Sequence, residues 1–381
     1  MKVILSIDPV RFPLTGIGRY TYELARHLGD IPEIEQLRFF AGHRFANALP
    51  ESAPSRSGDF RRLILNSRIA AGAFRITSRL LKQRTLRGYE DFLFHGPNFY
   101  LPPFDGPKVS TFHDLSMFTW AHSHPPGRVR YMQKEIQLML KHANMLVTDS
   151  EYTRCEIATY FGWPLEKIRV VPLACSPDFR PRSHSETREC LRKYSLSFNG
   201  YTLYTGTIEP RKNIQSLLGA YMLLPQQTRL RWPLVIAGYR GWKSEELHSR
   251  MKAAERAGWL RYLGYMPSND LPLLFSGARL FVFPSLYEGF GLPVLEAMAS
   301  GVPVVCSNAS SLPEVAGGAA AMCVPNDVET MANLIVAGLE DTIWRAEAKA
   351  KGLSRAKVFS WRRCATETAA VYRDVLSCSQ T

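Results

Sequence analysis

Residues 284–301 read PSLYEGFGLPVLEAMASG, and this stretch decides the fold expected for the chain. The apolar run Leu280–Phe283 before it is typical of a buried parallel strand. Pro293 suits the first turn of a helix, and Gly301 suits its end. Apolar residues at 302–305 then resume as another strand. The stretch therefore predicts a strand, a glycine-rich loop, a short helix and a second strand.

The predicted loop has the features of a phosphate site. Gly289 and Gly291 leave its backbone without side chains, so that a ligand could approach closely. The loop amides and the helix N-terminus converge on one spot, where an anion is favoured. Glu288 in the loop and Glu296 in the first turn of the predicted helix flank that spot, and because carboxylates repel phosphate we expect them to accept hydrogen bonds from hydroxyl groups. A diphosphate with a sugar at each end fits this arrangement.

The spacing of Glu288 and Glu296 resembles the E-x7-E element of retaining glycosyltransferases in family four. The resemblance implies the GT-B architecture, an α/β fold of two Rossmann-like, doubly wound parallel-sheet domains that face a central cleft. In such an enzyme the donor diphosphate would lie against the amides of Phe290, Gly291 and Leu292. Glu288 would hold sugar hydroxyls and Glu296 the ribose.

Length and composition agree with two α/β domains. A chain of 381 residues, 46% of them hydrophobic, is large enough for two ordinary cores. No apolar run approaches the ~18 residues of a membrane span, and residues 1–9 are too short and too soon acidic for a signal peptide. The seven cysteines are odd in number and lack C-x-x-C spacing, which predicts free thiols in a reducing cytoplasm.

Strand and helix patterns alternate along the chain, which favours two parallel sheets. The expected elements outside the unit above are a helix at 20–28 and strands at 2–7, 92–95, 109–113, 145–148, 202–205 and 234–237. A polar segment at 180–185 marks a boundary. We predict an acceptor-side N-terminal domain at 1–182, a nucleotide-sugar-binding domain at 183–358 and a terminal segment at 359–381, whose helix packs back on the first domain in relatives.

The formal net charge of +13 implies an anionic partner. Between residues 56 and 87, nine Lys or Arg accompany a single acid, with apolar residues interleaved. This pattern is that of a basic amphipathic helix suited to an anionic membrane surface; the alternative is a solvated helix face on an ordinary domain. Nucleic acid is not the expected partner, because no zinc pattern, RNA-recognition signature or Arg-aromatic ladder accompanies the charge.

Three further clusters should meet at the sheet edges where open α/β sheets bind ligands. The first contains Gly16 and Gly18, just before the first predicted helix. Thr21 stands where a dinucleotide fingerprint has its third glycine, so this pair alone fits a bare helix entry equally well. The family resemblance implies that Gly16 and Gly18 approach the donor phosphate and the acceptor.

The second cluster is the segment 206–213, GTIEPRKN, which follows a predicted strand. Arg211 and Lys212 could neutralise the charge that grows on a departing diphosphate. An adjacent Arg-Lys pair is common on surfaces, but beside the Glu288 loop we interpret it as functional. The segment resembles the phosphate-binding stretch of family-four mannosyltransferases. Thr207 stands where many relatives have arginine, so Arg211 and Lys212 must carry more of the phosphate charge.

The third cluster is His113 with Asp114, at the end of a predicted strand. The strand-end position and the adjacent acid favour a functional histidine over a structural one. The resemblance implies that His113 contacts the donor sugar near its reacting carbon. Asp114 either orients the imidazole or caps a turn.

The remaining candidates are Gly238, Tyr265 and Met266. Gly238 ends a strand, and the other two lie in a segment resembling the one whose backbone reads the nucleotide base in the family. Strand-end packing explains all three equally well. No metal and no cofactor are expected, because the sequence lacks a D-x-D motif, a Walker loop and a G-x-S-x-G elbow.

The resemblance implies a retaining transferase that moves a hexose, mannose first, from a GDP-sugar to a lipid-linked saccharide acceptor. The narrower likeness is to bacterial mannosyl- and rhamnosyltransferases of O-antigen synthesis. Such an enzyme would act at the inner face of the cytoplasmic membrane, with other polysaccharide-assembly enzymes as possible partners. The acceptor would attack from the side that the diphosphate leaves, although a covalent intermediate on Glu288 stays open.

Three alternatives remain from the sequence. They are a UDP-sugar-dependent transferase, a GT-B sugar-nucleotide epimerase and a non-catalytic nucleotide-sugar-binding protein. An epimerase would need neither acceptor nor membrane, and the basic stretch argues against it. A silent binding protein would tolerate the loss of Arg211, Lys212 or Glu288, and all three are present.

Overall fold

The computed structural model describes residues 1–50 and 68–378 of the chain, and the side chains of the helix 68–86 only from residue 77 onward. The first sheet contains seven strands: β1 (Lys2–Ser6), β2 (Gln36–Ala41), β3 (Arg44–Ala46), β4 (Leu93–Gly96), β5 (Lys108–Phe112), β6 (Met145–Thr148) and β7 (Ile168–Val170). The second sheet contains six: β8 (Thr202–Thr205), β9 (Leu234–Ala237), β10 (Leu260–Gly264), β11 (Leu280–Phe283), β12 (Val304–Ser307) and β13 (Ala321–Cys323).

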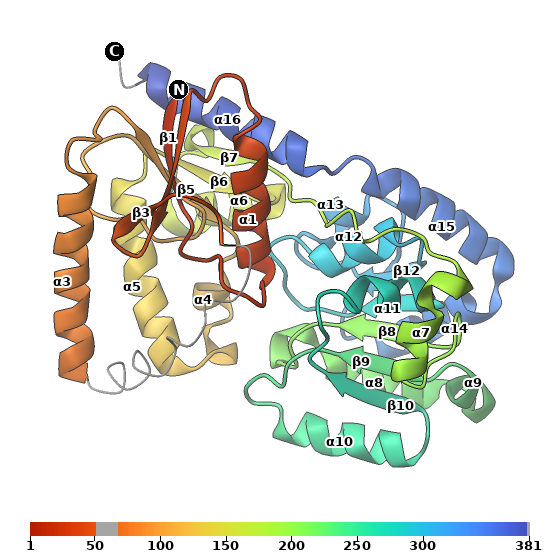
Figure 1. Ribbon diagram of the computed structural model, residues 1–381. Coiled ribbons are helices and arrows are strands. Elements are labelled where there is room, and N and C mark those ends of the chain that lie inside the picture. The colour runs from red at the N-terminus through yellow and green to blue at the C-terminus, as the bar shows by residue number, and fades with distance from the viewer. Residues whose placement is uncertain (51–67, 379–381) are drawn as a thin grey trace.

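The helices lie on both sides of each sheet (Figure 1). Those of the first half are α1 (Gly16–Leu28), α3 (Arg68–Leu86), α4 (Ser116–Thr119), η1 (Ala121–Ser123), α5 (Pro126–His142), α6 (Glu151–Phe161) and η2 (Leu165–Lys167). Those of the second half are α7 (His184–Lys193), η3 (Pro210–Lys212), α8 (Ile214–Leu223), α9 (Gln226–Arg231), α10 (Glu245–Arg256), α11 (Leu271–Gly277), α12 (Leu292–Ala299), α13 (Leu312–Ala316), α14 (Val328–Glu340), α15 (Thr342–Ala356) and α16 (Trp361–Cys378).

The strand orders are β3-β2-β1-β4-β5-β6-β7 and β10-β9-β8-β11-β12-β13. Neighbouring strands run parallel, apart from the antiparallel pair β2 and β3. In both sheets the order reverses about the first strand, which is the doubly wound arrangement. The predicted α/β fold with two parallel-sheet domains is therefore confirmed.

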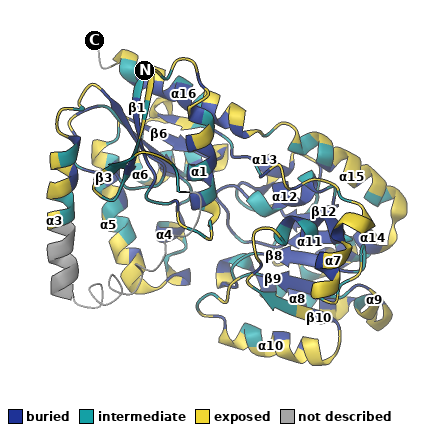
Figure 2. Ribbon diagram, viewed as in Figure 1, coloured by how far each residue is buried: buried dark blue, intermediate teal, exposed yellow. Residues whose placement is uncertain are grey.

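The central strands of both sheets are buried on their two faces, whereas β2, β3, β7, β10 and β13 are partly exposed (Figure 2). Along β1, Val3 and Leu5 belong to one hydrophobic cluster, whereas Ile4 between them belongs to another. Successive side chains of a strand point to opposite faces, so each face of this sheet packs against its own layer of helices. This explains why the strands appear in the sequence as continuous apolar runs.

The glycine-rich unit forms as predicted, with two shifts. β12 begins at Val304 rather than at residue 302, and Pro303, which has no N–H to give a strand ladder, immediately precedes it. α12 begins at Leu292, so Glu296 lies in the second helical turn and not in the first. The first helix was predicted from residue 20, but α1 begins at Gly16.

The terminal helix α16 packs against α1 and β6 of the first domain, as Figure 1 shows along its length. Tyr372 Oη lies 2.6 Å from His95 Nδ1, and Arg169 forms an ion pair of 3.2 Å with Asp374. The exact domain boundaries at 182 and 358 stay predictions. In the structure α7 begins at His184 and α16 at Trp361.

The basic stretch at 56–87 is described only in part, because residues 56–67 lie outside the described residues. The described end forms α3. There Lys82 is buried: its Nζ lies 3.3 Å from Asp8 Oδ2 and 4.3 Å from the centre of the Tyr100 ring. The expectation that this lysine belongs to a membrane-facing surface is wrong, because an acid of the loop after β1 binds it.

Other side chains of α3 do face solvent. Leu80 and Leu81 are 60% and 47% exposed, whereas the Arg79 guanidinium lies 3.8 Å from the Glu135 carboxylate of α5. In the described part of the chain, no helix has both the length and the apolar character needed to cross a bilayer.

Candidate functional site

The predicted residues of the two domains meet where the carboxyl ends of both sheets face each other. A Cβ placed on Gly289, after β11, would lie only 1.9 Å from the carbonyl oxygen of His113, after β5. Glycine is thus required here because the backbone of the other domain comes so close. The expectation that Gly289 clears space for a ligand is corrected: the group that approaches is the protein's own chain.

Arg211 and Lys212 of η3 contact Glu288, as the sequence predicted. Lys212 Nζ donates to Glu288 Oε1 at 2.5 Å, and Arg211 Nη1 lies 3.5 Å from Glu288 Oε2. All three side chains are at most 12% exposed. Burial works to raise the pKa of Glu288, but the two cations outweigh it, and the pKa lies below its usual range. The carboxyl group is therefore ionised at neutral pH.

The two cations differ in how firmly the protein holds them. Arg211 donates from Nη2 to Glu209 at 2.8 Å and from Nη1 to the carbonyl oxygen of Tyr287 at 2.7 Å. The Lys212 ammonium group donates one hydrogen bond within the described structure, to Glu288. An ammonium group has three donors, so Lys212 retains capacity for a further anionic partner. Arg211 instead fixes the loop that carries Glu288.

The amides of Phe290, Gly291 and Leu292 have no hydrogen-bond acceptor among the described residues. Gly291, the N-cap of α12, has φ +109°, and a Cβ there would lie 2.5 Å from the Leu312 side chain. Glycine is favoured at this position for two reasons: its φ is positive, and a side chain would collide with Leu312. Three free donors at a helix N-terminus are suited to bind an anion. The anion site that the sequence predicted at this loop stays a prediction.

Glu296 lies buried on α12, only 9% exposed. Its carboxyl group accepts no hydrogen bond from the described residues, and burial raises its pKa to about 7, partly opposed by Arg19 of α1. A buried carboxyl group without a donor is suited to receive hydroxyl groups. Arg19 was missed by the sequence reasoning, although it directly follows Gly18.

His113 makes two hydrogen bonds, and neither partner is Asp114. Nδ1 lies 2.7 Å from Asp149 Oδ2, and Nε2 lies 3.0 Å from the carbonyl oxygen of Pro97. A carbonyl only accepts, so Nε2 carries a proton. Burial works to lower the pKa of the imidazole, but Asp149 outweighs it and the pKa lies above its usual value.

Of the two roles considered for Asp114, the structure supports the turn cap. Its Oδ1 accepts the backbone N–H of Ser116 at 2.9 Å. Asp149, which follows β6, is the carboxylate that orients His113. It was missed, yet the rule that functional residues follow the carboxyl ends of parallel strands would have found it.

A buried hydrogen-bonded network lies behind His113. The Thr111 hydroxyl is 2.9 Å from His95 Nε2 and 2.8 Å from Tyr20 Oη. The Tyr20 ring packs edge-on against the His113 ring at 5.1 Å between centres. Burial, with His113 nearby, lowers the pKa of His95 to about 3, so that this ring is neutral. Through Tyr372, the same network fixes α16 to the first sheet.

The two glycines in the first turn of α1 differ in their surroundings. Gly18 lies against the chain after β1, since a Cβ there would lie 2.8 Å from the carbonyl oxygen of Pro9. Gly16 begins α1, and nothing lies within 4 Å of the position its Cβ would take. Gly18 is thus a packing glycine, and Gly16 leaves open space beside the helix entry.

The remaining candidates lie at the ends of β8, β9 and β10. A Cβ on Gly238 would lie 1.9 Å from the carbonyl oxygen of Gly206, so this glycine is required for packing. Tyr265 is 42% exposed and stacks on Tyr239 with ring centres 4.6 Å apart. Met266 is buried, and Thr207 is half-buried between these loops and η3.

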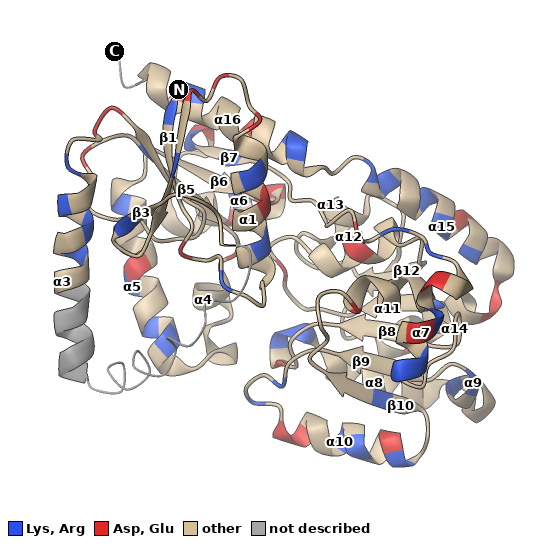
Figure 3. Cartoon of the chain, in the orientation of Figure 1, with Lys and Arg blue, Asp and Glu red and all other residues tan. Residues whose placement is uncertain are grey.

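The charged side chains form no assembled metal site in the described part of the chain, where no group of three or more His, Cys, Asp or Glu is placed to hold an ion. Acidic and basic residues are interspersed over both domains (Figure 3). The groups of the site that could hold a ligand are the free amides, Lys212 and the two glutamates. They suit an anion that carries hydroxyl groups.

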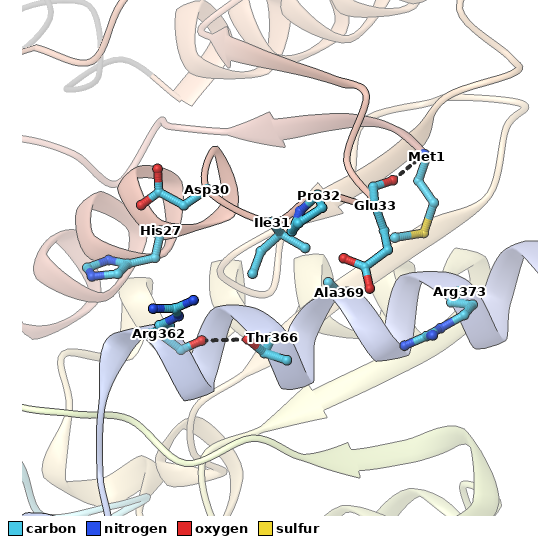
Figure 4. Close-up of a pocket in the computed structure, with 10 residues that line it drawn as sticks. All are labelled: Met1, His27, Asp30, Ile31, Pro32, Glu33, Arg362, Thr366, Ala369 and Arg373. Carbon is cyan, nitrogen blue, oxygen red and sulfur yellow. Dashed lines mark hydrogen bonds between the residues drawn. The ribbon is translucent and has the colours of Figure 1, made fainter.

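A surface cavity of about 400 Å³ lies elsewhere, between the end of α1 and α16 (Figure 4). Its walls include Met1, His27, Glu33 and Arg362. Met1 precedes β1, so this cavity lies at the amino end of the strand, opposite to the edge where the predicted residues meet. It contains none of them.

The chain is similar in sequence to known proteins. Residues 14–179 match the family described as Glycosyltransferase Family 4, and residues 197–355 match the one described as Glycosyl transferases group 1. The chain is 47% identical over 379 residues to the O-antigen chain mannosyltransferase B of Escherichia coli, covering 98% of this chain and 100% of that protein. The chain belongs to glycosyltransferase family four. It is a glycosyltransferase.

The chain is also similar to further known proteins. The serotype-specific mannosyltransferase WbdA of Escherichia coli is 35% identical over 247 residues, which are 63% of this chain and 30% of WbdA. Two solved structures show the fold alone: sucrose-phosphate synthase from Thermosynechococcus elongatus (TM-score 0.74, 16% identity, 99% and 100% coverage) and the lipopolysaccharide glycosyltransferase WaaG (TM-score 0.70, 14% identity, 97% and 99% coverage). The predicted GT-B architecture is confirmed.

Proposed function

We propose that this family-four enzyme transfers mannose from GDP-mannose to a lipid-linked saccharide acceptor in O-antigen assembly, with retention of configuration. The observation that carries the proposal is the 47% identity, along the whole chain, to an O-antigen chain mannosyltransferase. The paired cations and the free amides beside Glu288 supply the chemistry that a diphosphate leaving group requires.

In this reaction the donor diphosphate binds to the amides of residues 290–292 and to Lys212. Stabilising charge on the departing diphosphate by fixed donors is commonly the largest single contribution of an enzyme to the rate. Arg211 adds positive charge to the site without binding the diphosphate directly, because Glu209 and the Tyr287 carbonyl oxygen hold its guanidinium group. Glu288 accepts hydrogen bonds from the sugar, and Glu296 accepts those of the ribose.

As the anomeric bond lengthens, the sugar develops oxocarbenium character, and the acceptor hydroxyl attacks from the face that the diphosphate leaves. Its proton passes to an oxygen of the diphosphate. His113 is not the base in this scheme, because its Nε2 already donates to Pro97 and its Nδ1 faces Asp149. Its role is to give one wall of the site a fixed shape.

Purified enzyme should transfer label from GDP-mannose to membrane lipid extract, and less or none from GDP-rhamnose and UDP-sugars. A UDP-sugar as the preferred donor would favour the UDP-sugar-dependent transferase. Conversion of the donor without an acceptor would favour an epimerase, and donor binding without any turnover would favour a non-catalytic binding protein.

The transfer rate should be unchanged in EDTA, because Lys212 and the helix amides take the place of a metal ion. Activity lost in EDTA and restored by magnesium would contradict the metal-independent mechanism.

We further propose that the enzyme adsorbs to anionic membranes through the exposed side of α3. Leu80, Leu81 and Arg84 of α3 are exposed, and so is Arg87 directly after the helix. Each basic residue near such a surface contributes about 1 kcal/mol, so the double change Arg84→Gln with Arg87→Gln should weaken liposome binding about 30-fold. Flotation with anionic vesicles at increasing salt is the measurement, since screening should weaken binding by the wild type.

The matched control is Lys252→Gln with Arg256→Gln on α10, which removes the same charge from exposed positions of the other domain. This control should float like the wild type. If both double variants float equally well, α3 has another function.

A further inference from the structure

Both chain neighbours of Glu288 make hydrogen bonds to the other domain. Tyr287 is only 2% exposed, and its hydroxyl group has two partners there. It accepts the backbone N–H of Leu115 at 2.8 Å and donates to Glu156 Oε2 of α6 at 2.5 Å. The phenol therefore joins the loop of Glu288 to the segment after β5 and to α6.

Gly289, on the other side of Glu288, is held by the start of α6. Its carbonyl oxygen accepts hydrogen bonds from Ser150 Oγ at 2.7 Å and from Thr153 Oγ1 at 3.3 Å. Ser150 is the N-cap of α6. Glu288 thus lies between two residues that are both bound to the first domain.

A third contact brings the second domain to the same helix start. The Glu314 carboxylate of α13 accepts the free backbone N–H groups of Glu151 and Tyr152, at 2.8 and 2.6 Å. A carboxylate at a helix N-terminus satisfies amides that lack partners within the helix. Three separate groups of the second domain therefore converge on the first turns of α6.

Within its own domain the loop is also fixed. The backbone N–H of Glu288 donates to Ser310 Oγ at 2.8 Å, and the Ser311 hydroxyl donates to the carbonyl oxygens of Glu288 and Phe290 at 2.9 Å each. The backbone of Glu288 is thus held by its own domain and by the other one. Only its carboxyl group points to Lys212 and the proposed donor.

We propose that Tyr287 and Glu156 are positioning residues for the transfer reaction. The two hydrogen bonds of the Tyr287 hydroxyl group set the position of Glu288 relative to His113. The bond from the Leu115 N–H reaches the segment two residues after His113, and the bond to Glu156 holds the phenol in place for it. A displacement of the reacting groups by about 1 Å can lower the rate about 100-fold. The role rests on the proposed function, since the groups it aligns are those that hold the donor and its leaving group.

The test is Tyr287→Phe, which keeps the ring and removes the hydroxyl group. We expect kcat to fall about 10-fold or more, whereas the Kd for GDP stays near the wild-type value because Lys212 and the amides remain. Glu156→Ala should act in the same way. Glu156→Gln should recover much of the rate, because its amide oxygen still accepts the phenol.

Tyr160→Phe is the matched control, because it makes the same change on an exposed tyrosine of α6. It should leave kcat unchanged. Amide hydrogen exchange at Leu115 gives a readout that does not depend on the donor, and it should quicken in Tyr287→Phe and not in Tyr160→Phe. If the wild type transferred nothing from GDP-mannose, the proposed function would fail while the exchange test still applied. Unchanged exchange at Leu115, or unchanged kcat with an active donor, would overturn the positioning role.

Discussion

Lys212→Ala should lower kcat by about 100- to 1000-fold, the scale seen when one preorganised charge contact is removed from an active site. The Lys212 side chain is 12% exposed, and its ammonium group donates a single hydrogen bond within the described structure, to Glu288. Its remaining donors are the ones available to a departing diphosphate. The effect should appear mainly in kcat, because the charge on the diphosphate is greatest in the transition state.

Steady-state kinetics with GDP-mannose and a saccharide acceptor measure this effect. Lys252→Ala, on the exposed side of α10, is the control and should behave as wild type. Lys212→Ala should still fold, although it leaves Glu288 with the more distant Arg211 as its cation. A variant with wild-type turnover would mean that the diphosphate binds elsewhere.

The fold followed from the sequence because its central strands, such as β1, β8 and β11, are short runs of mostly buried residues. Leu280–Phe283 is such a run, and it forms β11 as predicted. The differences lie at element ends: Pro303 precedes the start of β12, and α1 begins at Gly16 rather than at residue 20. Local chemistry decides these ends, and periodicity alone does not show it.

The site followed from the sequence in part. Arg211, Lys212 and Glu288 come together as expected, since all three follow strands of one sheet. The partners of Tyr287 could not be predicted, because Glu156 is 131 positions away and in the other domain. Such pairings depend on how two folded domains meet, which no local pattern encodes. The same holds for Lys82, whose acid partner Asp8 lies 74 positions away.

Gly289 shows how a correct residue can be chosen for an incomplete reason. The sequence suggested that its missing side chain admits a ligand, whereas in the structure it admits the backbone of His113. Both readings require a glycine. They differ in what a substitution would do: a ligand-admitting glycine would affect binding, and a domain-contact glycine would affect the approach of the domains.

Gly289→Ala should therefore lower kcat about 100-fold while leaving GDP affinity nearly unchanged. The added Cβ would lie 1.9 Å from the carbonyl oxygen of His113 and 3.0 Å from Asp114 Cβ, and the nearest of these atoms belongs to the backbone and cannot rotate away. The φ of Gly289 lies outside the left-handed region, so alanine adds no backbone strain of its own. The domains must separate by about 1 Å, a displacement that costs about 100-fold when it falls on reacting groups.

Gly127→Ala is the matched control. Gly127 lies in the first turn of α5 with nothing within 4 Å of its Cβ position, and alanine there should stabilise the helix by about 0.5–1 kcal/mol without altering turnover. Kinetics, GDP titration calorimetry and small-angle scattering on both variants distinguish the cases. Reduced kcat with wild-type Kd and a slightly larger radius of gyration is the result we expect for Gly289→Ala. Wild-type kcat would mean that catalysis does not require the contact between Gly289 and His113. Weakened GDP binding without a loss of kcat would instead support the view that the missing side chain of Gly289 admits the ligand.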